Sequence, residues 1–158
     1  MSAVVREAVE ADAPAATEVL RRSIELLCIA DHGNDPVRLE SWLKNKTVSN
    51  VAAWISSAEN YCIVASIGQD VCGFGAMTHK GEIMLCYVDP SARFHGVSSA
   101  MLDALERRAR LLGLEEVRLN GTVTARRFYE ERGYVAVGCT QQAFESLSCQ
   151  AMAKRLAL

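Results

Sequence analysis

Three short apolar runs in the middle of the chain constrain its fold most. They cover residues 61–67, 71–77 and 82–88, and each pair is joined by three or four residues that include glycine. Runs of this length that alternate with glycine turns are typical of neighbouring antiparallel strands. The sequence therefore predicts a three-stranded antiparallel meander in the centre of the fold.

Before the meander, the sequence predicts one strand and two or three helices. A short apolar segment at 4–8 indicates the strand. Pro14 lies where the first position of a helix is expected, Asp35-Pro36 has the pattern of an N-cap and first residue, and Thr47 can cap a third helix. The polar run at 30–36 between the first two helices predicts a turn.

After the meander, helices alternate with strands. The pattern predicts a helix from Ser98 or Ser99 to Leu112, with Leu112 on its apolar face and Glu106 on its polar face. A strand at 117–119, a helix from Thr122 or Thr124, and strands at 134–138 and 148–153 follow. A helix that connects two strands of one sheet implies that the 82–88 and 117–119 strands are parallel. We therefore expect one α+β domain over 1–158, with a central mixed, mostly antiparallel, twisted sheet flanked by helices, in the order β-α-α-(α)-β-β-β-α-β-α-β-β.

Composition argues against several classes of function. The net charge is −2 and no basic run with interleaved aromatic residues occurs, so nothing indicates binding to nucleic acid. No apolar run approaches the roughly 20 residues of a membrane span, and the N-terminus lacks an export-signal pattern, so we expect a cytoplasmic protein that does not contact membranes. The three histidines and six cysteines lack metal-ligand spacing, so we expect no metal site and buried thiols at Cys28, Cys62, Cys72, Cys86, Cys139 and Cys149.

The segment after the third apolar run has the layout of an anion-binding site. Val88-Asp89-Pro90 ends the strand in a turn, and Arg93 and Gly96 directly precede a helix. The first N–H groups of a helix have no intrahelical partner and carry partial positive charge, so a pyrophosphate binds there without a metal. Glycine lets such a ligand approach the backbone. An ordinary surface turn with an arginine is the alternative interpretation.

Two motifs resemble the GNAT superfamily of N-acetyltransferases. EIMLCYVDP at 82–90 with RFHGVS at 93–98 is similar to the family's apolar strand, V-x-P and R/Q-x-x-G-x-G/A. TVTARRFYEERGY at 122–134 is similar to N-x-x-A-x-x-F-Y-x-x-x-G-F. Both motifs occur in the family's order, and the predicted elements agree over nearly the whole chain. The sequence departs from the family where Ser98 replaces the frequent glycine or alanine and Thr122 the frequent asparagine.

The resemblance implies that the anion is the pyrophosphate of acetyl-coenzyme A, the acetyl donor, with no metal. In the family, the loop and helix start bind the pyrophosphate, and the pantetheine arm pairs with the strand before them where two strands splay apart. Carried over to this sequence, the cofactor-binding residues are Tyr87, Val88, Arg93, Phe94, His95, Gly96, Val97, Ser98, Ser99, Thr122 and Phe128.

The resemblance also implies two catalytic residues. Transfer of an acetyl group to an amine requires loss of the ammonium proton and protonation of the departing thiolate. Tyr129 occupies the position of the family's general acid, and Glu82 lies where some members place the base. The alternatives are a core tyrosine on the apolar face of a helix and a solvated carboxylate after the turn at Gly81.

In the family, the helices before residue 61 wall the acceptor site. Asp31, His32 and Asp35 are thus candidate contacts for a small cationic amine, unless Asp35 only caps a helix and Asp31 is solvated. The resemblance predicts an acetyl-coenzyme-A-dependent N-acetyltransferase that acts on a primary amine of a small molecule or amino-acid-like metabolite by direct attack in a ternary complex. Protein or peptide N-acetylation and a non-catalytic acyl-coenzyme-A sensor stay open as alternatives, and so does a homodimer.

Overall fold

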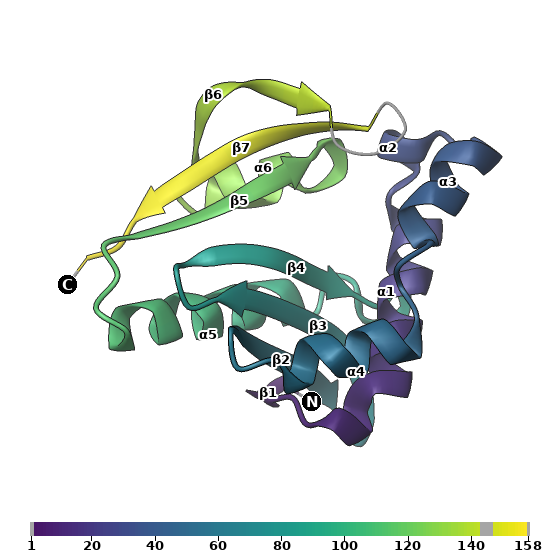
Figure 1. Cartoon of the computed structure of the whole chain (residues 1–158), viewed down its shortest axis with the longest axis horizontal. Helices are drawn as coiled ribbons and strands as arrows, with labels where there is room; N and C mark the ends of the chain where they lie inside the picture. The colour runs from purple at the N-terminus through teal and green to yellow at the C-terminus, as the bar shows by residue number, and fades with distance from the viewer. Residues whose placement is uncertain (1, 143–146, 158) are drawn as a thin grey trace.

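The computed structural model describes residues 2–142 and 147–157, and these form one seven-stranded sheet in the order β1-β2-β3-β4-β5-β7-β6 with helices around it (Figure 1). The strands are β1 (Val4–Glu7), β2 (Asn60–Ile67), β3 (Asp70–Thr78), β4 (Glu82–Val88), β5 (Glu116–Thr122), β6 (Val135–Gln142) and β7 (Ser148–Arg155). The α-helices are α1 (Ala13–Leu27), α2 (Ile29–His32), α3 (Pro36–Leu43), α4 (Val48–Ser56), α5 (Val97–Leu111) and α6 (Val123–Glu131). This confirms the predicted fold class and, apart from the additional short helix α2, the predicted order of elements.

The sheet is antiparallel except between β4 and β5, which run parallel as predicted. Only two residue pairs join these strands, Glu82 with Arg118 and Ile83 with Leu119. Beyond them the half of the sheet with β5, β7 and β6 diverges from the half with β1 to β4, and Figure 1 shows the two halves separating toward α1, α2 and α3. The pairing therefore ends before the middle of β4.

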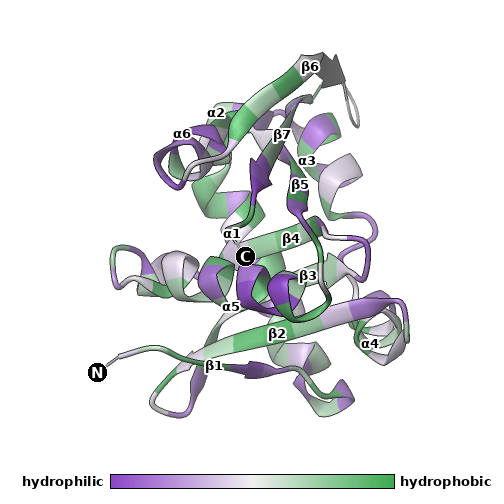
Figure 2. Cartoon of the chain, turned by 90° about the vertical axis from the view of Figure 1, so that its left-hand side faces the viewer, coloured by the Kyte–Doolittle hydropathy of each residue, from purple (hydrophilic) through white to green (hydrophobic). Residues whose placement is uncertain are grey.

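Helices cover both faces of the β1–β4 half. Cys62 and Val64 pack under α1 and α4, whereas Ile63 and Ala65 belong to the cluster with α5. Burial on both faces explains why residues 61–65 of β2 form an unbroken apolar run. In Figure 2 the middle of β2 is coloured hydrophobic, while α5 carries hydrophilic as well as hydrophobic residues.

Two local predictions are wrong, and a third holds only in part. The polar run at 30–36 contains the predicted turn at Gly33 and Asn34, but its first residues, up to His32, belong to the short helix α2. Leu112 was expected on the apolar face of the helix but is 37% exposed. Glu106 was expected on the polar face and is 4% exposed, because the Tyr134 hydroxyl and the Lys154 ammonium bind its carboxylate.

The cysteines follow the prediction only in part. Cys28, Cys62 and Cys72 are buried and free, whereas Cys86 and Cys149 are free but only half-buried. The side chain of Cys139 lies outside the described residues. Among the described residues, no group of three or more histidine, cysteine, aspartate or glutamate side chains could hold a metal ion. None of the helices in the described ranges is long and apolar enough to cross a membrane.

Asp12 fixes the connection between β1 and α1. Both terminal nitrogens of Arg6 donate to its carboxylate at 2.8 Å, and the N–H of Val9 donates at 2.8 Å. The hydrogen bonds from Arg6 hold the pKa of Asp12 below its ordinary value, although partial burial works in the opposite direction. The charged form of Asp12 therefore stabilises the folded state.

Replacing Asp12 by asparagine should lower the free energy of unfolding by about 2 kcal/mol at neutral pH, because a charge-assisted hydrogen-bond pair is lost. The folded-state pKa of Asp12 lies below the unfolded one, so its stabilisation is complete above the unfolded pKa and is lost as the pH falls through the folded pKa. Urea titrations of both proteins across acidic pH should converge at the lowest values. A difference that does not depend on pH would contradict this role.

Candidate active site

A cavity of about 600 Å³ opens where β4 and β5 separate. Its wall contains β4 from Ile83 to Val88, the loop before α5 and the first residues of that helix. Across the opening lie residues of β5 and α6, and α1 with the residue after it closes one end. Because pairing with β5 stops at Ile83, the rest of this edge of β4 has no strand partner among the described residues and presents backbone N–H and C=O groups to the cavity.

The loop before α5 has an unusual backbone. Gly96, the N-cap residue, has φ +75°, and apart from its neighbours in the chain no atom of the described residues lies within 4 Å of the position that a Cβ would occupy. Phe94 has φ +66°, is 91% exposed, and places its ring 4.8 Å from the guanidinium carbon of Arg93. A bulky residue in the left-handed region is strained, and such strain concentrates at ligand-binding loops. The open space at Gly96 faces the N-terminus of a 15-residue helix.

The structure brings most of the predicted cofactor residues together. Ten of the eleven line the cavity, namely Tyr87, Val88, Arg93, Phe94, Gly96, Val97, Ser98, Ser99, Thr122 and Phe128, and His95 does not. Thr122 caps α6 through the N–H of Ala125, as the sequence predicts.

Arg132 is a cavity residue that the sequence interpretation missed. Its guanidinium lies 4.2 Å from the centre of the Phe128 ring and donates a hydrogen bond to the hydroxyl of Ser99. It thus connects the end of α6 to the start of α5 and adds positive charge to the wall beside Arg93. One sequence signal could have identified Arg132. It lies within the second motif, between the aromatic pair Phe128-Tyr129 and Gly133.

Tyr129 lies in the cavity wall and is 7% exposed. Its ring makes edge-to-face contacts with Phe128 at 5.3 Å and with Tyr134 at 5.6 Å between centroids. Burial raises the pKa of Tyr129 well above its ordinary value, and the neighbouring Cys86 acts in the same direction. Burial likewise raises the pKa of Cys86 to about 12, with Tyr129 acting in the opposite direction. The phenol is therefore protonated at neutral pH and capable of donating a proton.

Glu82 has a different environment. It is the exposed first residue of β4, opposite Arg118, and it does not line the cavity, whereas Ile83 and Met84 after it do. Among the described residues of the wall the one carboxylate is that of Glu131, whose side chain is 57% exposed and forms an ion pair with Arg127.

The three residues predicted to contact the acceptor, Asp31, His32 and Asp35, do not line the cavity and instead have structural roles. The Asp31 carboxylate is buried and accepts hydrogen bonds from the N–H groups of Val123 at 2.7 Å and Thr124 at 3.1 Å, and from the Thr124 hydroxyl. A ring nitrogen of His32 lies 2.8 Å from a carbonyl oxygen of α1, and Asp35 caps α3. The expectation of a solvated Asp31 is thus wrong, and that of a capping Asp35 is confirmed.

The residues that line the cavity beside α1 are small or apolar. They are Ser23, Leu27 and Cys28, from α1 and the position after it, together with Tyr87 of β4. The pKa of the Tyr87 hydroxyl is raised chiefly by burial, with Trp42 acting in the opposite direction. In the sequence, Ser23 and Leu27 have the spacing of core residues of a helix, and a residue that faces a cavity at a sheet opening has the same spacing.

Replacing Asp31 by alanine should lower the free energy of unfolding by about 2 kcal/mol, because the first N–H groups of α6 lose their acceptor in a buried place. Asp35→Ala is the matched control, since its cap is exposed, and should cost less than about 1 kcal/mol. Denaturant unfolding measures both. A fully stable Asp31→Ala protein with a raised KM for an acceptor would instead return Asp31 to the acceptor site.

Comparison with known proteins identifies the family. Residues 26–156 match the sequence model described as an acetyltransferase (GNAT) domain, so the chain belongs to the GNAT family and is an N-acetyltransferase. No curated protein matches the sequence.

Solved structures agree over the whole chain. A GCN5-related N-acetyltransferase from Rhodopseudomonas palustris superposes with a TM-score of 0.88 at 25% identity, covering 99% of this chain and 97% of that one. The PaiA N-acetyltransferase of Thermoplasma acidophilum, in complex with coenzyme A, gives 0.80 at 19% identity, with coverage of 99% and 100%. YncA, a putative acetyltransferase from Salmonella typhimurium with its cofactor acetyl-coenzyme A, gives 0.75 at 19% identity, with coverage of 100% and 96%.

Proposed function

We propose that this enzyme transfers the acetyl group of acetyl-coenzyme A to a primary amine of a small molecule or amino-acid-like metabolite, by direct attack in a ternary complex. The observation that carries the proposal is one continuous cavity. It joins the open helix start at Gly96, the unpaired edge of β4 and the buried phenol of Tyr129. Each part suits one section of acetyl-coenzyme A.

The helix start suits the pyrophosphate. The first N–H groups of α5 have no intrahelical acceptors and lie next to the open space at Gly96, and Arg93 and Arg132 add positive charge without a metal. The unpaired backbone of β4 suits the amides of pantetheine, which would pair with it as another strand does. The coenzyme A bound in PaiA and the acetyl-coenzyme A bound in YncA support the same ligand here.

The chemistry follows from Tyr129. A neutral amine attacks the thioester carbonyl, and backbone N–H groups near Cys86 and Tyr87 would stabilise the oxyanion. The carbon–sulfur bond then breaks, and the Tyr129 hydroxyl donates its proton to the departing thiolate. Glu82 is the proposed base that takes the amine proton, and because it lies just beyond the cavity wall it would act through water.

The lining beside α1 favours a small acceptor over a protein. Ser23, Leu27 and Cys28 form this part of the wall, rather than the acidic side chains that would suit a basic peptide. A non-catalytic sensor is disfavoured by Tyr129, whose buried and protonated hydroxyl reaches the wall beside the β4 edge.

Gly96→Asp should abolish cofactor binding, because the side chain fills the open space and puts negative charge beside the pyrophosphate. Aspartate tolerates the left-handed conformation of this position better than most residues, so the fold should persist. Gly96→Asn is the matched control, and it should bind more weakly than the parent but at least about tenfold more tightly than Gly96→Asp, since it lacks the charge. Calorimetry with coenzyme A measures all three, and undiminished binding by Gly96→Asp would refute the site.

Tyr129→Phe should lower kcat by about 10²-fold while the affinity for coenzyme A stays the same, because only the proton donor is removed. Release of coenzyme A thiol over a panel of amines measures turnover, and calorimetry measures binding. Full turnover by the variant would remove Tyr129 from catalysis. A protein that binds the cofactor and never turns over, even unmodified, would support the sensor alternative.

A further inference from the structure

We propose that Tyr134, held by the buried side chain of Glu106 and the half-buried side chain of Lys154, is a positioning residue that orients Tyr129 for proton transfer. The proposal rests on the proposed role of Tyr129 as the general acid. These three residues are called the Tyr134 cluster below, and they come from three elements. Glu106 lies on α5, Lys154 on β7, and Tyr134 between α6 and β6.

The cluster contains a carboxylate inside an apolar core. Glu106 is 4% exposed, and both its oxygens are engaged, one by the Tyr134 hydroxyl at 2.9 Å and the other by the Lys154 ammonium at 2.9 Å. Arg110 lies 3.8 Å from the carboxylate. Burial of a charge is costly even when it is paired, and apolar replacements are often equally stable. A gain in stability thus does not explain why a charge is buried here. A need to hold neighbouring side chains in a fixed geometry does.

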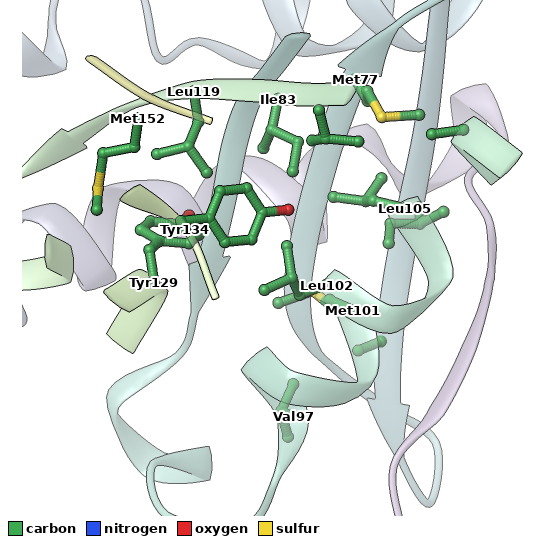
Figure 3. Close-up of a cluster of buried hydrophobic side chains, with 14 of the residues drawn as sticks. Met77, Ile83, Val97, Met101, Leu102, Leu105, Leu119, Tyr129, Tyr134 and Met152 are labelled. Atoms are coloured by element: carbon green, nitrogen blue, oxygen red, sulfur yellow. The ribbon is translucent and has the colours of Figure 1, made fainter. Parts of the chain in front are cut away.

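The geometry that the cluster fixes is that of Tyr129. The ring of Tyr134 contacts the ring of Tyr129 at an interplanar angle of 66°, and the N–H of Tyr134 donates to the carbonyl of Tyr129 at 3.1 Å. Phe128 contacts the Tyr129 ring as well, at an angle of 71°. Figure 3 shows Tyr129 and Tyr134 side by side, between Leu119 and Ile83 of the sheet and the side chains of α5.

The cluster also connects the acid to the cofactor end. Glu106 lies nine residues after Val97 on the same helix, a distance of about 14 Å along its axis. The helix that presents its first N–H groups to the cavity is therefore tied, through Glu106 and Tyr134, to the residue that would protonate the thiolate. Proton transfer requires heavy atoms about 2.6–3.2 Å apart, and a misplacement of about 1 Å can cost 10²-fold in rate.

The test is Tyr134→Phe, which keeps the ring and removes only the hydroxyl bound to Glu106. We expect kcat to fall about tenfold, with unchanged KM for acetyl-coenzyme A and unchanged affinity for coenzyme A. In a Tyr129→Phe background the same substitution should leave kcat unchanged, because no hydroxyl remains to be oriented. Tyr61→Phe is the matched control, since Tyr61 does not line the active-site cavity and should keep full kcat.

Glu106→Gln provides a second variant if Tyr134→Phe does not fold, and it should lower kcat in the same background-dependent way. Equal losses in both backgrounds would show a merely structural role and overturn the inference. Full kcat in Tyr134→Phe, with a slow Tyr129→Phe enzyme, would also overturn it and leave the general acid in place. Full kcat in Tyr129→Phe would instead remove the proposed acid itself, so the two failures are distinguishable.

Discussion

The early end of the pairing between β4 and β5 is the constraint on which the rest of the site depends. Only Glu82 and Ile83 have partners on β5, and the remainder of β4 therefore keeps one unpaired backbone edge. An unpaired edge inside a protein is costly unless a ligand satisfies it. The opening also gives the helix start at Gly96 and the phenol of Tyr129 access to one shared cavity.

The two halves of the opened sheet are held at their separation by polar contacts between distant parts of the chain. Asp31 accepts hydrogen bonds from the start of α6, 92 residues later in the sequence. Arg132, the residue after α6, donates a hydrogen bond to Ser99 of α5. Glu106 of α5 accepts hydrogen bonds from Tyr134, which follows α6, and from Lys154 of β7. These contacts fix the ends of α6, the helix that carries Tyr129, to α2 and α5. Polar contacts therefore join the elements on both sides of the cavity.

The sequence was sufficient for what local patterns determine. Turn residues and apolar runs predicted β2 to β4, and Asp35 and Thr47 predicted helix starts that the structure contains. The loop from Arg93 to Gly96 could be predicted because its glycine and helix start adjoin in the chain. Local sequence patterns could not show where β4 and β5 separate, because strand pairing brings together residues about 36 positions apart.

The same reason explains the residues that were misplaced. Asp31 has the local pattern of a solvated loop residue, and only its contact with α6 buries it. Glu106 has the spacing of a residue on the polar face of its helix. Its partners, Tyr134 and Lys154, lie far along the chain and meet it only in the folded structure. Ser23 and Leu27 have the spacing of core residues, and only the opening of the sheet turns them toward the cavity.

The most direct measurement is a calorimetric titration of the unmodified protein with acetyl-coenzyme A in the presence of a metal chelator. The account predicts saturable binding at one site per chain, with the same affinity with and without the chelator, because backbone N–H groups and arginines supply the contacts to the pyrophosphate. Absence of binding at millimolar acetyl-coenzyme A, or binding that requires a metal ion, would contradict it.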